Sequence, residues 1–170
     1  MARHPRSRIG RVPSPLQRAA VPIVMTMVAS MITLLPMIST APILPPFGLV
    51  VLLAWRTIHR TIWPAWIGLP LGLWDDLFSG QVIGSAMMMW TISLFFLDIA
   101  DRRMVWRDVW QEWGFTARLC TAVLLCQLWA AHATGGGTNA LLLLPQMLIT
   151  IFAFPPVARL CAAVDEWRLR

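Results

Sequence analysis

Long stretches with almost no charged residues limit the folds that this chain can adopt. Three runs contain at most two charged residues each: residues 19–55, 61–97 and 113–158. With 58% hydrophobic and only 13% charged residues, the composition differs from that of a soluble domain. A helix needs roughly 20 residues to cross a hydrocarbon core of about 30 Å, so each run is long enough for about two crossings. The sequence therefore predicts an all-α integral membrane protein with about six transmembrane helices.

Proline and glycine indicate where each run breaks. The first run contains Pro42, Pro45 and Pro46, which interrupt a helix because proline lacks an N–H group and restricts its neighbour. Gly80 and the triplet Gly135 to Gly137 supply turns in the second and third runs. The spans are then expected at about 20–41, 46–57, 62–77, 83–99, 114–133 and 140–158. The second of these is short for a full crossing.

The arginines predict how the spans are oriented. All fourteen cationic side chains are arginines, and they lie between the apolar runs rather than in one stripe that could follow a nucleic acid. If the basic tail at 1–18 is cytoplasmic, six spans place the charged connections and the C-terminal segment 159–170 on the same side. Arg118, one turn inside the fifth span, can extend its side chain to that side. This positive-inside pattern predicts a multi-pass plasma-membrane protein with both termini in the cytoplasm.

The connection at 101–113 is expected to form a helix of its own. One face carries apolar residues and the other is polar, a pattern typical of a helix lying in the membrane interface. The apolar face consists of Val105, Trp106, Val109, Trp110 and Trp113. The alternative is that this segment extends the neighbouring spans into the cytoplasm.

Two adjacent carboxylates stand out in the turn between the third and fourth spans. The motif comprises Gly72, Asp75, Asp76, Gly80 and Gly84. Gly68 and Gly72 are one helical turn apart, so they form a flat strip for close helix packing, with Asp76 one turn further on. We predict a structural role for the acids near the outer headgroups. They are expected to cap exposed amides at the turn or to hydrogen-bond across helices, with the motif at a partner interface.

Other chemistry finds little support in the sequence. Neighbouring residues on a helix point about 100° apart, so Asp75 and Asp76 cannot face each other as an acid–base pair. A cation or proton path would need more polar groups through the membrane than the chain offers. The histidines and cysteines lack metal-ligand spacing. The sequence therefore predicts no enzyme activity, no metal site and no cofactor.

The turn motif resembles a known family. Gly72-Leu73-Trp74-Asp75-Asp76-Leu77, with Gly80 and Gly84 following, is similar to the signature of the rod shape-determining protein MreD family. The match assigns the family's acid to Asp76 and leaves Asp75 as a variable position. The resemblance implies a non-enzymatic scaffold in the bacterial inner membrane that belongs to the cell-elongation machinery. It implies as partners an MreC-like bitopic protein, an MreB-like actin filament and the enzymes that build lateral peptidoglycan, besides membrane lipids.

A second function stays open. The MreD family is similar in fold to the six-helix substrate-binding components of energy-coupling-factor vitamin transporters. The chain could then be a small-molecule-binding membrane component of such a transporter. That function requires a polar pocket near the outer face, for which the chain offers Asp75, Asp76, Gln81, His132 and Asn139.

Overall fold

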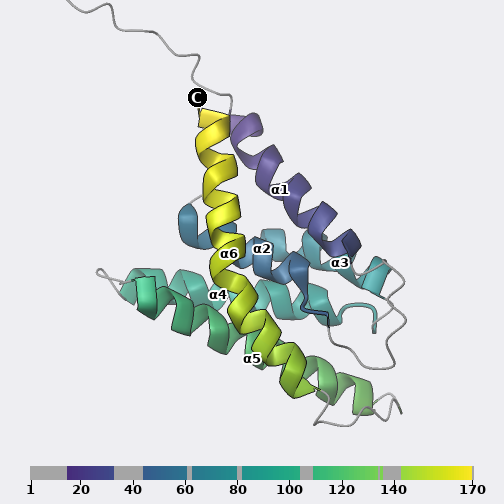
Figure 1. Ribbon diagram of the computed structural model, residues 1–170. Helices are drawn as coiled ribbons and strands as arrows, with labels where there is room; N and C mark the ends of the chain where they lie inside the picture. Colours follow the sequence, from purple (N-terminus) through teal and green to yellow (C-terminus); the bar gives the residue numbers. More distant parts are fainter. Residues whose placement is uncertain are drawn as a thin grey trace, which may run out of the picture.

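The computed structural model describes residues 15–32, 44–60, 63–79, 82–103, 109–133, 135 and 143–169, and over these ranges it is entirely helical (Figure 1). The helices are α1 (Pro15–Met31), α2 (Phe47–Ile58), α3 (Gly68–Ser79), α4 (Ser85–Arg103), α5 (Val109–Ala133) and α6 (Leu143–Leu169), with a 3-10 helix, η2 (Ala65–Ile67), before α3. The predicted all-α class is confirmed, since no strand occurs in these ranges.

Several predicted boundaries differ from the observed ones. α3 begins at Gly68 rather than near residue 62, because Pro70 has no N–H group and fits only in a first helical turn. α1 starts inside the expected basic tail, and the end predicted for the first span near 41 lies outside the described residues. α6 continues to Leu169 instead of ending near 158, and its last turns contact the end of α2, where His59 lies 2.7 Å from Asp165.

The separate helix expected at 101–113 is not seen where the chain is described. Residues 101–103 end α4, and residues 109–113 begin α5. Residues 104–108 lie outside the described ranges. The described parts of this connection therefore extend the neighbouring helices, which was the alternative.

Within the residues that the structure describes, two helices, α5 and α6, are long and apolar enough to cross a membrane, fewer than the six expected. Only 22% and 17% of their apolar stretches are buried in the protein, whereas the core helix of a soluble protein would be mostly covered. α1 and α2 contain shorter apolar segments. α2 has 12 residues, which gives a length of about 18 Å.

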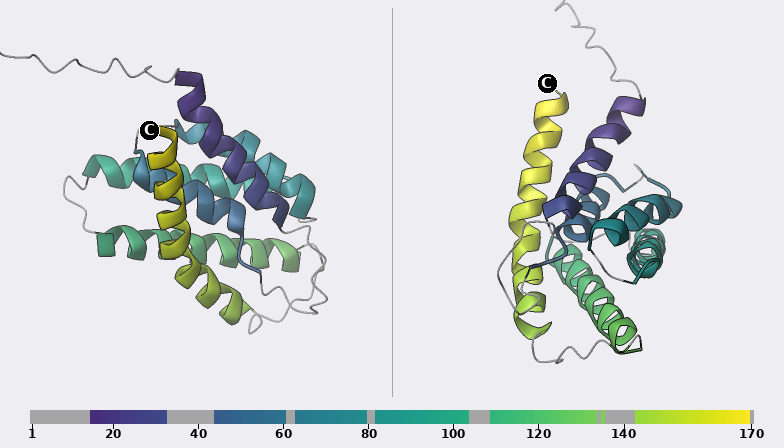
Figure 2. Two further views of the ribbon diagram at one scale, coloured as in Figure 1. Left: turned by 45° about the horizontal axis from the view of Figure 1, so that its top comes forward. Right: turned by 90° about the vertical axis from the view of Figure 1, so that its right-hand side faces the viewer.

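α2 forms the centre of the molecule. Every residue from Gly48 to Arg56 is buried, and α2 contacts α1, α4, α5 and α6. Its side chains pack into one core with Trp90 of α4 and Phe154 of α6. The start of α1 and the end of α6 lie at the same end of the molecule (Figure 1, and Figure 2, right).

The predicted glycine strip brings α3 and α4 into backbone contact. A Cβ atom at Gly68 would lie 2.7 Å from the backbone nitrogen of Thr91, and one at Gly72 would lie 2.5 Å from the Cα of Met87. Real Cβ atoms essentially never approach other heavy atoms this closely. Only glycine therefore permits the observed spacing of these two helices, and the predicted role of the strip is confirmed.

We predict that Gly72→Ala lowers the free energy of unfolding by about 1–3 kcal/mol, because the new methyl group must push the α4 backbone away. Gly114→Ala in α5 is the matched control, since a Cβ there meets nothing within 4 Å. It should leave stability unchanged or raise it by about 0.5–1 kcal/mol. Denaturant unfolding of the detergent-purified protein measures both. Equal shifts for the two variants would contradict the close α3–α4 packing.

Candidate functional site at the turn between α3 and α4

Asp76, in the last turn of α3, caps the start of α4. Its side chain is only 2% exposed. One carboxylate oxygen, Oδ2, accepts hydrogen bonds from the backbone N–H groups of Gly84 at 2.9 Å and Met87 at 3.2 Å. The other oxygen, Oδ1, accepts the N–H of Ala86 at 2.9 Å and the Ser85 hydroxyl at 3.3 Å. A single carboxylate thus satisfies three amides at a helix N-terminus, where four lack intrahelical partners.

The cap differs from an ordinary N-cap because the capping side chain comes from another helix. An N-cap residue normally bonds the amides of its own helix. Here the capping carboxylate of Asp76 belongs to α3, so the bonds also tie α3 to α4. The negative charge lies where the dipole of α4 is positive, which adds to the attraction. These bonds are those of the capping role that the sequence predicts for Asp76.

Gly84 shapes the turn that presents these amides. Its φ angle is +96°, in the left-handed region that other residues rarely adopt. The N–H of Ser85 donates to the carbonyl of Val82 at 3.0 Å, and the N–H of Met88 donates to the carbonyl of Gly84 at 3.0 Å. The turn therefore closes and passes directly into α4. Gly80 and Gln81 lie outside the described residues.

Asp75 is also buried, but it contacts different helices from Asp76. Its carboxylate interacts with the Ser30 side chain of α1. Both groups lie against Gly48 of α2, where an added Cβ would be 2.2 Å from the Ser30 oxygen and 3.2 Å from Asp75 Oδ1. The ring of Trp90 from α4 reaches the same point, at 2.9 Å. Four helices therefore meet at Asp75.

The structure brings together most of the motif. Gly72 and Asp76 face α4, Gly84 receives the cap, and Asp75 turns toward α1 and α2. Sequence reasoning missed Ser30 and Gly48, although a hydroxyl and a glycine in an otherwise apolar run were the available signal. Among the described residues, no group of three or more His, Cys, Asp or Glu side chains could hold a metal ion.

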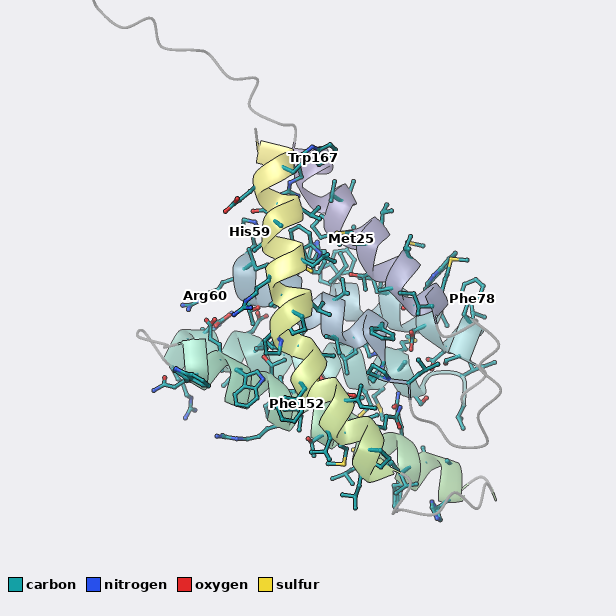
Figure 3. All side chains as sticks on the ribbon, in the orientation of Figure 1. Met25, His59, Arg60, Phe78, Phe152 and Trp167 are labelled. Carbon is teal, nitrogen blue, oxygen red and sulfur yellow. The ribbon has the colours of Figure 1, made fainter. Side chains whose placement is uncertain are left out.

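A second polar cluster lies at the opposite side of the molecule from Phe78, which is next to the turn (Figure 3). Arg56 of α2 is only 4% exposed and forms ion pairs with Asp98 and Asp101 of α4. Arg60 pairs with Glu112 of α5 at 3.0 Å. These bonds hold the end of α2 to the end of α4 and the start of α5.

The same cluster reaches α6. His59 contacts Asp165 at 2.7 Å, and Asp165 also accepts a bond from Arg168 at 2.6 Å. The guanidinium of Arg168 lies over the Trp55 ring, 5.6 Å from its centroid. The arginines of the sequence predicted topology but not these pairs. The available sign of the pairs was that Arg56 and Arg60 are one helical turn apart, so both can meet acids on a facing helix.

Comparison of the chain with models of protein families, with curated proteins and with solved structures finds no match. The likeness to MreD proteins thus depends on the residues of the turn.

We predict that Asp76→Ala exposes the start of α4. Loss of the carboxylate leaves the amides of Gly84, Ala86 and Met87 without their acceptor, and their hydrogen exchange should speed up by about tenfold. Asp75→Ala is the matched control, because Asp75 bonds Ser30 and none of these three amides is bonded to it. Hydrogen exchange measured by mass spectrometry over residues 82–90 reports the difference. The cap would be refuted if both variants exchanged at the wild-type rate there.

Proposed function

We propose that this chain is a multi-pass protein of the bacterial inner membrane and a non-enzymatic scaffold of the rod-shape machinery. In this role it links peptidoglycan synthesis to the actin-like cytoskeleton through helix contacts within the bilayer. The proposal includes six spans and a cytoplasmic location of both termini. It is supported by the turn motif of the MreD type, by the apolar helices and by the sorting of charge.

The exposed tryptophans of α5 support a membrane location. Trp110 and Trp129 are 79% and 76% exposed, near the two ends of the helix. Their separation along the axis is about 28 Å, close to the thickness of a hydrocarbon core. Tryptophan is enriched at both membrane–water interfaces. A bilayer would thus cover the exposed apolar side chains between them, such as Leu125.

The short central helix is compatible with six spans. A lipid-facing helix must extend over the full hydrocarbon thickness, whereas at positions buried in protein a non-helical backbone is also tolerated at membrane depth. α2 is surrounded by four other helices, so its length of 12 residues does not have to match the bilayer. The arginines at its end, Arg56 and Arg60, lie with those at the end of α4, Arg102 and Arg103, consistent with a single charged side.

The scaffold proposal depends on α3, which has one face packed against α4 and another face exposed. Gly68, Gly72 and Asp76 face α4, and the residue after each of them is an exposed leucine. The leucine column consists of Leu69, Leu73 and Leu77, and Val82 and Ile83 of the turn are exposed as well. Because the glycines and Asp76 are held against α4, the orientation of the leucine column is fixed as well. We infer that a partner's transmembrane helix packs on this leucine column.

Such a surface suits a scaffold. Helices associate in lipid through close packing rather than through the hydrophobic effect, so a rigid column with a fixed shape is favoured. Asp76 holds this shape without being exposed to the partner. The resemblance to MreD proteins points to an MreC-like single-span protein as the occupant.

We predict that photo-reactive residues at Leu77 and Val82 capture a single-span partner or wall synthases in native membranes. Leu148 on α6 is the matched control, since its exposure of 56% is close to the 62% of Leu77. Mass spectrometry identifies the captured proteins. Equal capture at Leu148 would argue against a specific interface. Capture of transporter ATPase-module subunits, or a small molecule retained in place of a protein partner, would favour the transporter component.

A further inference from the structure

A groove lies away from the turn, between the end of α2, the start of α5 and the middle of α6. Its volume is about 730 Å³, within the range of small-molecule sites. Its walls include Ile58, Trp110, Trp113, Phe152, Phe154 and Arg159. Phe152 is visible on the front of α6 in Figure 3.

The aromatic walls of the groove are fixed in place. The Trp113 indole N–H donates to the carbonyl of Ile151 on α6 at 3.1 Å, which joins the two sides of the groove. Trp110 packs edge-on against Trp113, with ring centroids 6.0 Å apart. Trp110 and Phe152 nevertheless remain 79% and 68% exposed. The groove is thus an ordered apolar surface that a ligand could cover.

Arg159 places a positive charge among the lining residues of the groove. Glu112 lines it, but its carboxylate is paired with Arg60. Arg159 is exposed and forms no ion pair with any side chain that the structure describes. An anionic group on the ligand would provide the missing counter-charge.

The two ends of the groove differ in character, one being apolar and the other charged. Phe152 and Arg159 lie about 10 Å apart along α6. Arg159 is on the side toward the C-terminal end of the helix, where Arg168 also lies. An amphiphile with an apolar chain and an anionic head fits this order, with its head at the charged end of the protein.

We propose that this groove binds an anionic glycerophospholipid, with its phosphate at Arg159 and an acyl chain over Phe152 and Phe154. A partner helix is a poorer occupant, because it would cover Arg159 without neutralising it, and an unpaired charge is costly away from water. The inference rests on the membrane location in the proposed function and is independent of the protein partner.

The test is native mass spectrometry of the detergent-purified full chain mixed with phosphatidylglycerol and phosphatidylcholine of identical acyl chains. The wild-type protein should bind phosphatidylglycerol preferentially. Arg159→Gln should lower this preference by about fivefold. Arg118→Gln is the matched control, because Arg118 is also an exposed arginine but does not line the groove. It should keep the wild-type preference.

A second variant tests the apolar part of the groove. Ala158→Trp places a large ring among the lining residues, and it should reduce the binding of both lipids. Equal losses for Arg159→Gln and Arg118→Gln, or unchanged binding in Ala158→Trp, would overturn the inference. If the protein can be extracted from membranes without detergent, the membrane location is refuted. If extraction needs detergent but the protein does not prefer phosphatidylglycerol to phosphatidylcholine, only the lipid-binding role of the groove is refuted.

Discussion

The bond between Asp76 and the start of α4 is the interaction on which the rest of the turn depends. One buried carboxylate satisfies the amides of Gly84, Ala86 and Met87, and it does so from a neighbouring helix. The two helices can come close enough for this because Gly72 has no side chain. In an apolar environment an unsatisfied helix terminus is especially costly, so the cap and the close packing reinforce each other.

The two adjacent acids, Asp75 and Asp76, together join four helices, each through different contacts. Asp76 joins α3 to α4, while Asp75 and Ser30 meet at Gly48 and join α3 to α1 and α2. The arginine cluster secures the opposite end of the same bundle, where α2, α4, α5 and α6 are connected by ion pairs. Polar contacts at both ends thus hold helices whose outer faces are mostly apolar. The leucine column and the groove lined by Trp110 and Phe152 are separate surfaces of this bundle.

Local chemistry made part of this structure predictable from the sequence. The break after Pro46 and the strip containing Gly72 follow from properties of single residues and of helical spacing, and both are observed. The pairing of Arg56 with Asp98 joins residues far apart in the chain, so hydropathy and charge patterns could not reveal it. The continuation of α6 to Leu169 was missed for a related reason, because its last turns depend on contacts with α2.

The proposed role of the leucine column as a partner-binding surface can be tested through cell shape. In cells whose only copy carries Leu73→Ser and Leu77→Ser, at wild-type protein levels, we expect rods to become round. The matched control is Leu144→Ser with Leu148→Ser, a pair of exposed leucines with the same spacing on α6. It should leave rods unchanged. Normal rods in the first strain, or equal rounding in both, would contradict the claim.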